Sequence, residues 1–181
     1  MGKSAFQVTV ADLLHRPGAR RHEQITGTLE PLRVVDTTVA GDAPVTVDVT
    51  LEWVSEGILA TGTVAAPFAA SCRRCLTDVH GDVEAKFQEL FEPNARDGES
   101  YPLHGDRMDL GPLAREVLLL GLPLAPLCLE ACQGLCPTCG ADLNQGPCDC
   151  QPADIDPRWA ALEGLLVDPP PDPPEEPSGN G

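Results

Sequence analysis

Between residues 24 and 83, apolar and β-branched residues alternate with polar ones, which is typical of half-buried β-strands. The clearest runs are residues 32–35, 45–53 and 58–64, and a further alternating run covers 81–91. Short stretches rich in glycine and proline separate the runs and leave no room for crossover helices. The pattern therefore predicts an antiparallel sheet.

The first twenty residues show a weaker version of the same pattern. Phe6, Val8 and Val10 alternate with polar residues and predict a short strand. Residues 11–14 fit a single helical turn. The stretch 17–21 contains proline, glycine and two arginines, so we expect an exposed basic loop there.

A long loop and a helix are predicted after the last alternating run. Residues 92–109 are polar and hold two prolines and two glycines, which favours a loop. Pro112 suits the first turn of a helix, and Leu113, Val117 and Leu120 lie at helical spacing. Glycine and proline just beyond them end the helix.

The C-terminal part adds two elements, a short amphipathic helix near Trp159 and a tail with six prolines that we expect to be disordered. The predicted fold class is α+β, with an antiparallel β-sheet core, a short helix, a cysteine-rich zinc-knuckle segment and a C-terminal helix. The expected regions are an N-terminal strand and basic loop (1–23), an antiparallel β domain with one helix (24–127), a cysteine-rich metal-binding segment (128–150), a short C-terminal helix (151–167) and a disordered proline-rich tail (168–181).

Composition fits a soluble globular protein, and we expect the chain to be cytoplasmic. Hydrophobic residues make up 42% and charged residues 22% of 181 residues, no apolar run reaches the length of a membrane helix, and no signal peptide follows Lys3. Cytoplasmic thiols stay reduced, so the eight cysteines are expected to be metal ligands and not disulfides.

The cysteine spacing supports zinc binding. Cys136 and Cys139 are separated by two residues and are followed by a glycine. This pattern is typical of a knuckle, a tight turn that directs two thiolates at one ion. Cys72 and Cys75 have the same spacing. The candidate metal ligands are Cys72, Cys75, Cys128, Cys132, Cys136, Cys139, Cys148 and Cys150.

Eight thiolates are enough for two structural zinc sites of four ligands each. We expect one site to be formed by Cys72, Cys75, Cys128 and Cys132. We expect the other to be formed by Cys136, Cys139, Cys148 and Cys150. A ribbon-like alternative combines Cys72, Cys75, Cys136 and Cys139, and leaves four cysteines to be explained. Unliganded thiols or redox disulfides are further alternatives. Neither C-x-x-C pair opens a helix in a βαβ unit, as a catalytic pair would, and the four histidines lie outside the cysteine-rich segment.

The charge distribution indicates a basic protein partner. The formal net charge is −16, and residues 75–181 alone carry twenty acidic and five basic residues. An acidic surface repels phosphate, so naked RNA or DNA is disfavoured, and no membrane or small-molecule partner is indicated. Direct RNA binding remains an alternative, because a few basic residues could contact phosphate: Arg20, Arg21, Arg73 and Arg74.

Several segments together resemble the YceD family, the large ribosomal RNA subunit accumulation proteins. They are Cys72–Leu76, the helix 114–120 and the stretch 123–144, and residues 155–159 resemble the actinobacterial branch. The similarity covers most of residues 6–166, and the cysteine-rich stretch is its specific part.

The resemblance implies a non-catalytic accessory factor in large ribosomal subunit biogenesis, needed for ribosomal RNA to accumulate. It makes a basic ribosomal protein or the pre-ribosomal large subunit the expected partner, and it supplies no catalytic residue. We therefore expect no enzymatic activity, and zinc with a structural role. The alternatives are a direct RNA-binding zinc protein and a redox or metal-dependent enzyme.

Overall fold

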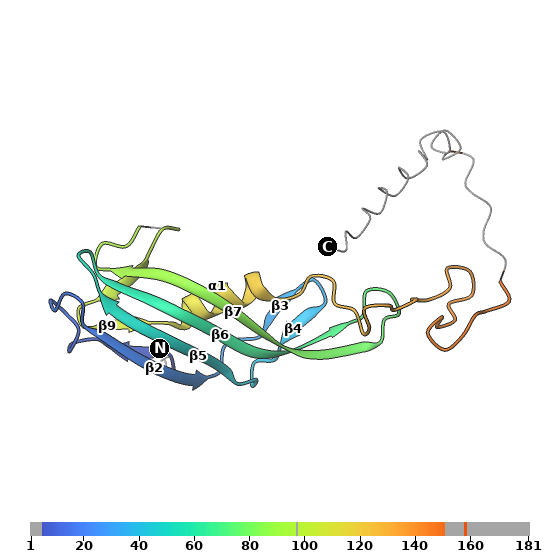
Figure 1. Ribbon diagram of the computed structural model, residues 1–181, viewed down its shortest axis with the longest axis horizontal. Coiled ribbons are helices and arrows are strands. Elements are labelled where there is room, and N and C mark those ends of the chain that lie inside the picture. Colours follow the sequence, from blue (N-terminus) through green and yellow to red (C-terminus); the bar gives the residue numbers. More distant parts are fainter. Residues whose placement is uncertain (1–4, 97, 151–157, 159–181) are drawn as a thin grey trace, which may run out of the picture.

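A long, curved β-sheet with one helix against it makes up most of the computed structural model, which describes residues 5–96, 98–150 and 158 (Figure 1). The nine strands of this described part are β1 (Gln7–Thr9), β2 (Arg20–Gly27), β3 (Leu32–Val34), β4 (Thr37–Val39), β5 (Val45–Trp53), β6 (Ile58–Ser71), β7 (Asp78–Glu92), β8 (Tyr101–His104) and β9 (Arg107–Asp109). The helix α1 spans Gly111–Gly121. The predominantly β character was predicted.

The strand order is β1-β9-β8-β7-β6-β4-β3, and β5 pairs with both β6 and β2. The neighbours are antiparallel, as predicted, except that β7 and β8 are parallel through the pairs Phe91–Tyr101 and Glu92–Pro102. The β6–β7 hairpin is the longest ladder, with register partners from Ile58–Phe91 to Ser71–Asp78. These two strands therefore connect the two ends of the sheet.

Strict alternation explains why β5 lies in the middle of the core. Val45, Val47, Val49 and Leu51 are completely buried on one face, while the polar residues between them are half-buried. On β6, a Cβ at Gly62 would stand 1.9 Å from the carbonyl oxygen of Asp48, so only glycine allows the two strands to approach this closely.

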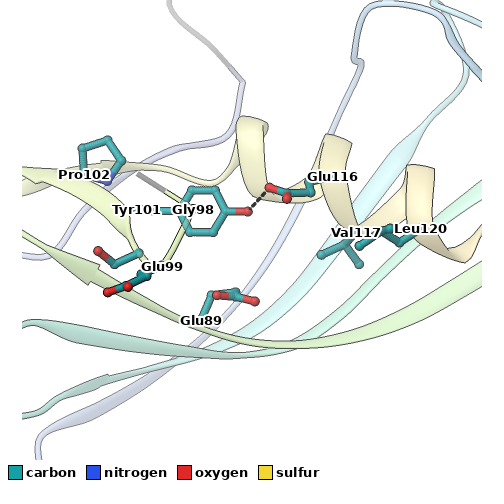
Figure 2. Close-up of a pocket in the computed structure, with 9 residues that line it drawn as sticks. Glu89, Gly98, Glu99, Tyr101, Pro102, Glu116, Val117 and Leu120 are labelled. Carbon is teal, nitrogen blue, oxygen red and sulfur yellow. Dashed lines mark hydrogen bonds between the residues drawn. The ribbon is translucent and has the colours of Figure 1, made fainter. Parts of the chain in front are cut away.

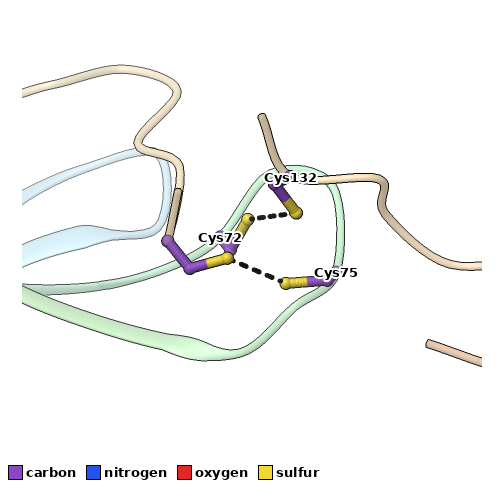
Figure 3. A group of neighbouring side chains, drawn as sticks. Cys72, Cys75 and Cys132 are labelled. Carbon is purple, nitrogen blue, oxygen red and sulfur yellow. Dashed lines mark hydrogen bonds between the residues drawn. The ribbon is translucent and has the colours of Figure 1, made fainter. Parts of the chain in front are cut away.

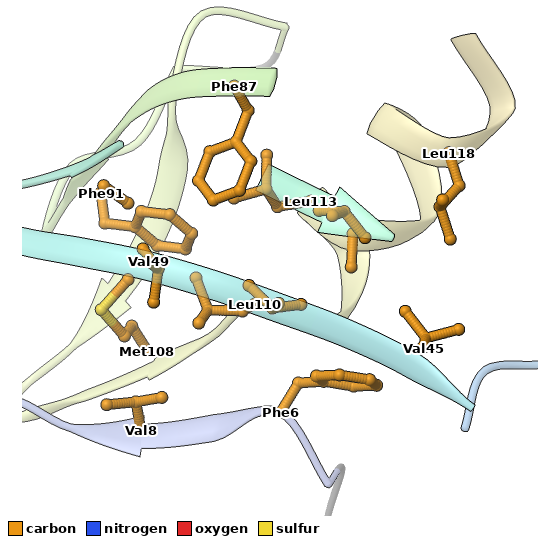
Figure 4. Packing of buried hydrophobic residues seen from close by; sticks show 14 of the residues in the cluster. Phe6, Val8, Val45, Val49, Phe87, Phe91, Met108, Leu110, Leu113 and Leu118 are labelled. Atoms are coloured by element: carbon orange, nitrogen blue, oxygen red, sulfur yellow. The ribbon is translucent and has the colours of Figure 1, made fainter. Parts of the chain in front are cut away.

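The helix α1 covers the apolar face of the sheet, where it packs against β7, β6 and β3. Its buried side chains belong to the same core as those of β5, β9 and the N-terminal segment (Figure 4). Pro112 occupies its first turn, as predicted. Leu113, Ala114 and Leu118 are buried, but Leu120 is 83% exposed. Leu120 lies at helical spacing from Leu113 but is exposed, because the buried stripe is centred on Ala114 and Leu118 and leaves Leu120 at its margin.

Two predictions of loops were wrong. The stretch 17–21 contains the start of β2, and the stretch 92–109 contains β8 and β9. β2 lacks an apolar face: its exposed side chains instead meet polar partners on β5, as Arg20 does with Glu52. β8 and β9 have only four and three residues, which is too short for alternation to register as a pattern.

The expected C-terminal helix (151–167) and proline-rich tail (168–181) lie outside the described residues. The α+β class stays a prediction. No helix in the described part of the chain combines the length and apolarity that a membrane span requires.

Candidate metal centres

The first cysteine cluster joins the β6–β7 turn to the segment that follows α1. Cys72 and Cys75 lie in the turn, Cys128 and Cys132 lie in the later segment, and all four sulfurs are within 4.8 Å of one another (Figure 3). The Sγ atoms of Cys75 and Cys128 are 3.4 Å apart, and those of Cys72 and Cys132 are 3.8 Å apart. The pair in the turn and the pair in the later segment are at least 53 positions apart in sequence, yet their sulfurs form one compact group.

The second cluster is local and contains the remaining cysteines, whose sulfurs also lie within 4.8 Å of one another. Its members are Cys136, Cys139, Cys148 and Cys150. All eight cysteines are free thiols. The structure therefore groups them in the partition that spacing favoured, and not in the ribbon-like alternative.

The turn at Cys72 has the backbone of a knuckle. The amide of Arg74 donates a hydrogen bond to the Cys72 sulfur at 3.4 Å, and the amide of Leu76 donates to the Cys72 carbonyl at 2.9 Å. Leu76 has a φ of 62°, a left-handed conformation that disfavours a leucine. The turn thus holds a bulky, exposed residue where glycine is usual.

The turn at Cys136 repeats these contacts with the expected glycine. The amide of Thr138 donates to the Cys136 sulfur at 3.4 Å, and the amide of Gly140 donates to the Cys136 carbonyl at 2.9 Å. Gly140 has a φ of 74°. The two knuckles have the same geometry, so each presents a sulfur that accepts a backbone hydrogen bond, as a thiolate ligand does.

Electrostatics distinguish the thiols within each cluster. Burial opposes the thiolate of Cys72, but backbone hydrogen bonds from Cys75, Cys128 and Arg74 outweigh it and lower the pKa to about 6. Backbone hydrogen bonds from Cys139 and Thr138 likewise lower the pKa of Cys136 to about 6. At least one thiol in each cluster is therefore readily ionised.

The thiols of Cys128 and Cys150 behave in the opposite way. The pKa of Cys128 is raised to about 12, first by a side-chain hydrogen bond with Cys75 and second by burial. The pKa of Cys150 is raised to about 12, first by a side-chain hydrogen bond with Cys139 and second by burial. Four thiolates this close repel one another. A bound cation would allow all four to ionise together.

The geometry fits a tetrahedral zinc ion. A Zn–S bond of about 2.3 Å places the sulfurs of a tetrahedron about 3.8 Å apart. The sulfurs of Cys75 and Cys128, at 3.4 Å, and those of Cys72 and Cys132, at 3.8 Å, are separated by distances near this value. Each cluster could therefore hold a metal ion, and four sulfur ligands without an open position are typical of a structural zinc site.

Polar contacts that spacing did not reveal connect the two clusters. The Arg74 guanidinium donates to the Cys132 carbonyl at 2.8 Å, and the Arg74 carbonyl accepts from the Leu135 amide. The Asn144 side chain donates to the Cys132 sulfur at 3.4 Å and accepts from the Gln133 amide at 2.8 Å. Asn144 lies only four residues after the glycine of the second knuckle. This proximity was the one sequence signal that could have indicated its contact with the cysteines.

The candidate RNA-contacting arginines do not form one surface. Arg20 pairs with Glu52, and Arg21 pairs with Asp12 and Glu23. These residues lie near the first residues of β6 in the sheet, whereas Arg73 and Arg74 follow the last residue of β6. Three of the four guanidinium groups are engaged within the chain.

Comparison with known proteins gives a family match over the region that contains both clusters. The family model of the large ribosomal RNA subunit accumulation protein YceD matches residues 60–166. The chain is 36% identical over 174 residues to Rv2926c of Mycobacterium tuberculosis, described as uncharacterized, which covers 90% of this chain and 82% of that protein.

More distant relatives also match. YlbN of Bacillus subtilis is 27% identical over 146 residues, which is 78% of this chain and 85% of that protein. The chloroplastic protein of Arabidopsis thaliana named large ribosomal RNA subunit accumulation protein YCED homolog 1 is 31% identical over 65 residues, 36% of this chain and 20% of that protein. No solved structure matches the chain significantly.

Proposed function

Because this chain belongs to the YceD family, we propose that it is a non-catalytic accessory factor in large ribosomal subunit biogenesis, needed for ribosomal RNA to accumulate. The observation that carries the proposal is the extent of the family match. Residues 60–166 include most of β6, the strands β7 to β9, the helix α1 and all eight cysteines. The role is thus proposed for the part of the molecule that contains the metal centres.

In this proposal zinc has a structural role. Cys72, Cys75, Cys128 and Cys132 would hold one ion, and the second cluster would hold another. Each ion would supply a closed, four-sulfur cross-link and no reactive position. The first cross-link would fix the segment after α1 to the β6–β7 turn, and the second would close the local loop 136–150.

The proposed partner is a basic ribosomal protein or the pre-ribosomal large subunit in the cytoplasm. The net charge of −16 supports a basic partner, since acidic surfaces attract basic proteins and repel bare phosphate. The separation of the arginines also favours this partner over direct RNA binding, because it leaves no continuous basic surface among Arg20, Arg21, Arg73 and Arg74.

A depletion strain tests the biogenesis role. Lysates from depleted and repleted cells are compared on a sucrose gradient, and large-subunit ribosomal RNA is quantified against small-subunit RNA. We expect the free and assembled large-subunit peaks to fall together with their RNA, while small-subunit RNA accumulates normally. An unchanged ratio of the two RNAs on depletion would refute the proposal.

A further inference from the structure

A groove with three glutamates lies near the end of the sheet opposite to the cysteine clusters (Figure 2). It encloses about 400 Å³. Glu89 comes from β7, Glu99 from the loop before β8, Tyr101 from β8, and Glu116 and Leu120 from α1. We refer to these five residues as the acidic groove.

Glu89 lies at a position of β7 where the alternating pattern predicts an apolar side chain. Val83, Phe87 and Phe91 are buried on the helix-facing side of β7, and Glu89 falls in the same alternating row. Its side chain is half-buried, and no hydrogen bond or ion pair to it is found within the part of the chain that the structure describes. A carboxylate withdrawn from water in this way is stabilised by a nearby cation.

Tyr101 fixes the second carboxylate of the groove. Its hydroxyl donates a hydrogen bond to Glu116 at 2.5 Å, and its ring stacks on Phe91. Burial, this hydrogen bond and the charges of Glu116 and Glu89 raise the pKa of Tyr101 well above its usual value. The phenol therefore stays protonated and holds Glu116 in place, so the carboxylate is positioned before any ligand arrives.

The third observation is an unpartnered apolar surface on the same side of α1. Leu120 is 83% exposed, one turn after Glu116, and the half-buried Val117 lies beside it. Figure 2 shows Glu116, Val117 and Leu120 along one side of the helix, with Glu89 on the strand below. Leu120 thus offers an apolar contact beside the carboxylates for the alkyl stem of a charged side chain.

The shape of the groove favours an organic cation over a metal ion. The carboxylate oxygens of the three glutamates are not gathered within 4.8 Å of one another, as the cysteine sulfurs are, so they do not surround a single ion. Lysine and arginine combine a cationic end with an alkyl stem that can pack on Leu120.

We propose that the acidic groove binds lysine or arginine side chains of an amphipathic segment of a basic protein. The carboxylates of Glu89 and Glu116 pair with the cationic ends, and Leu120 packs on the apolar side of the segment. The net charge of the whole chain, −16, attracts the same class of partner. This inference rests on the proposed function, for which it names the surface that recognises the partner.

The test uses the full chain, purified with its bound metal, and a fluorescent twelve-residue peptide made of arginine, leucine and alanine. A second peptide has citrulline, the neutral analogue, in place of arginine. We expect the arginine peptide to bind and the citrulline peptide to bind at least about tenfold more weakly at physiological salt. Equal binding of the two peptides would contradict a charge-based groove.

Matched variants locate the binding surface. The double variant Glu89→Gln and Glu116→Gln keeps the side-chain shapes, and we expect it to weaken binding of the arginine peptide about tenfold. The control, Asp82→Asn and Glu84→Gln, removes the same charge from the exposed face of the same strand and should change binding less than about twofold. Equal weakening by both pairs, or none by the groove pair, would overturn the proposal.

Two further outcomes separate the alternatives. Leu120→Ser should weaken peptide binding about threefold, because it removes the apolar side chain on which the peptide packs. If spermine bound as tightly as the peptide and with the same sensitivity to the groove pair, the groove would be a polyamine site and the proposal would fail. Melting curves confirm that each variant folds.

The same variants distinguish this inference from the proposed function. If depletion of the wild-type chain lowers large-subunit RNA but the groove pair restores it fully, the groove inference fails and the function stands. If depletion has no effect on that RNA, the proposed function fails whatever the peptide measurements give.

Discussion

The two ends of the β6–β7 hairpin are stabilised in different ways. Along most of β6, the sheet, α1 and the N-terminal segment form a core of 24 buried residues in the described part of the chain, among them Phe91, Leu51 and Leu118. Beyond the end of β6, the buried cluster consists of Cys72, Cys75 and Cys132, and only partly buried side chains surround it. One region folds by burying apolar surface, whereas the other has four sulfurs that could hold a metal ion.

This difference teaches that stability need not be uniform along a single sheet. The core needs no ligand, because its side chains bury apolar surface against one another. The cysteine end holds a segment with few apolar contacts, so we expect its order to be coupled to metal binding. Changes at one end are therefore expected to leave the other end largely intact.

Metal removal should produce the largest difference between the two ends. With a strong chelator, we expect amides in residues 126–150 to lose hydrogen-exchange protection, while β5 and β6 keep theirs. A structural zinc site contributes about 10 kcal/mol or more to local folding. Hydrogen exchange followed by mass spectrometry measures this, and native mass spectrometry should count two zinc ions per chain beforehand. Loss of protection throughout the sheet would contradict the separation.

A cavity in the core should have the opposite effect. Phe91→Ala removes a completely buried ring that stacks on Tyr101, and we expect it to cost about 3 to 5 kcal/mol of unfolding free energy. The zinc count should not change. Phe91→Leu, which leaves a smaller cavity, is the matched control and should cost clearly less. Zinc loss in the folded Phe91→Ala variant would show that the two ends are coupled.

Arg74 should matter more than its neighbour. Arg74→Met removes the guanidinium that donates to the Cys132 carbonyl, and we expect a loss of about 1 to 2 kcal/mol in the stability of the cysteine end. Arg73→Met is the control, because no side-chain hydrogen bond of Arg73 is found among the described residues, and it should change little. Competition with a chromogenic chelator measures the effect as zinc affinity. Equal effects of the two substitutions would remove the proposed difference.

The smallest effect is expected at the strained knuckle residue. Leu76→Gly relieves a left-handed conformation and should raise zinc affinity, by at most about 1 kcal/mol, because the gain is partly offset by the greater freedom of glycine in the unfolded chain. Leu76→Ala keeps the strain and should show no gain. A loss of affinity in Leu76→Gly, measured with the same chelator, would mean that the leucine side chain itself supports the site.

The sequence predicted the cysteine partition because ligand spacing and loop-closure cost are local properties. It also predicted the runs that became β5, β6 and β7, whose alternation is long enough to detect. It could not predict the start of β2, since this strand has no apolar face and is stabilised by polar pairs such as Arg20–Glu52. The acidic groove was equally hidden, because Glu89 and Glu116 meet only through the packing of α1 on β7.

The length of β6 sets the distance between the two regions of this molecule that a partner could contact. Its 14 residues extend about 45 Å at the rise of an antiparallel strand. The acidic groove lies near one end of this span and the knuckles lie just past the other. A protein that touched both would need an extended arm or two separate contact points. The hairpin thus acts as a fixed spacer, and a shorter or longer β6–β7 ladder would change which assemblies could engage both ends at once.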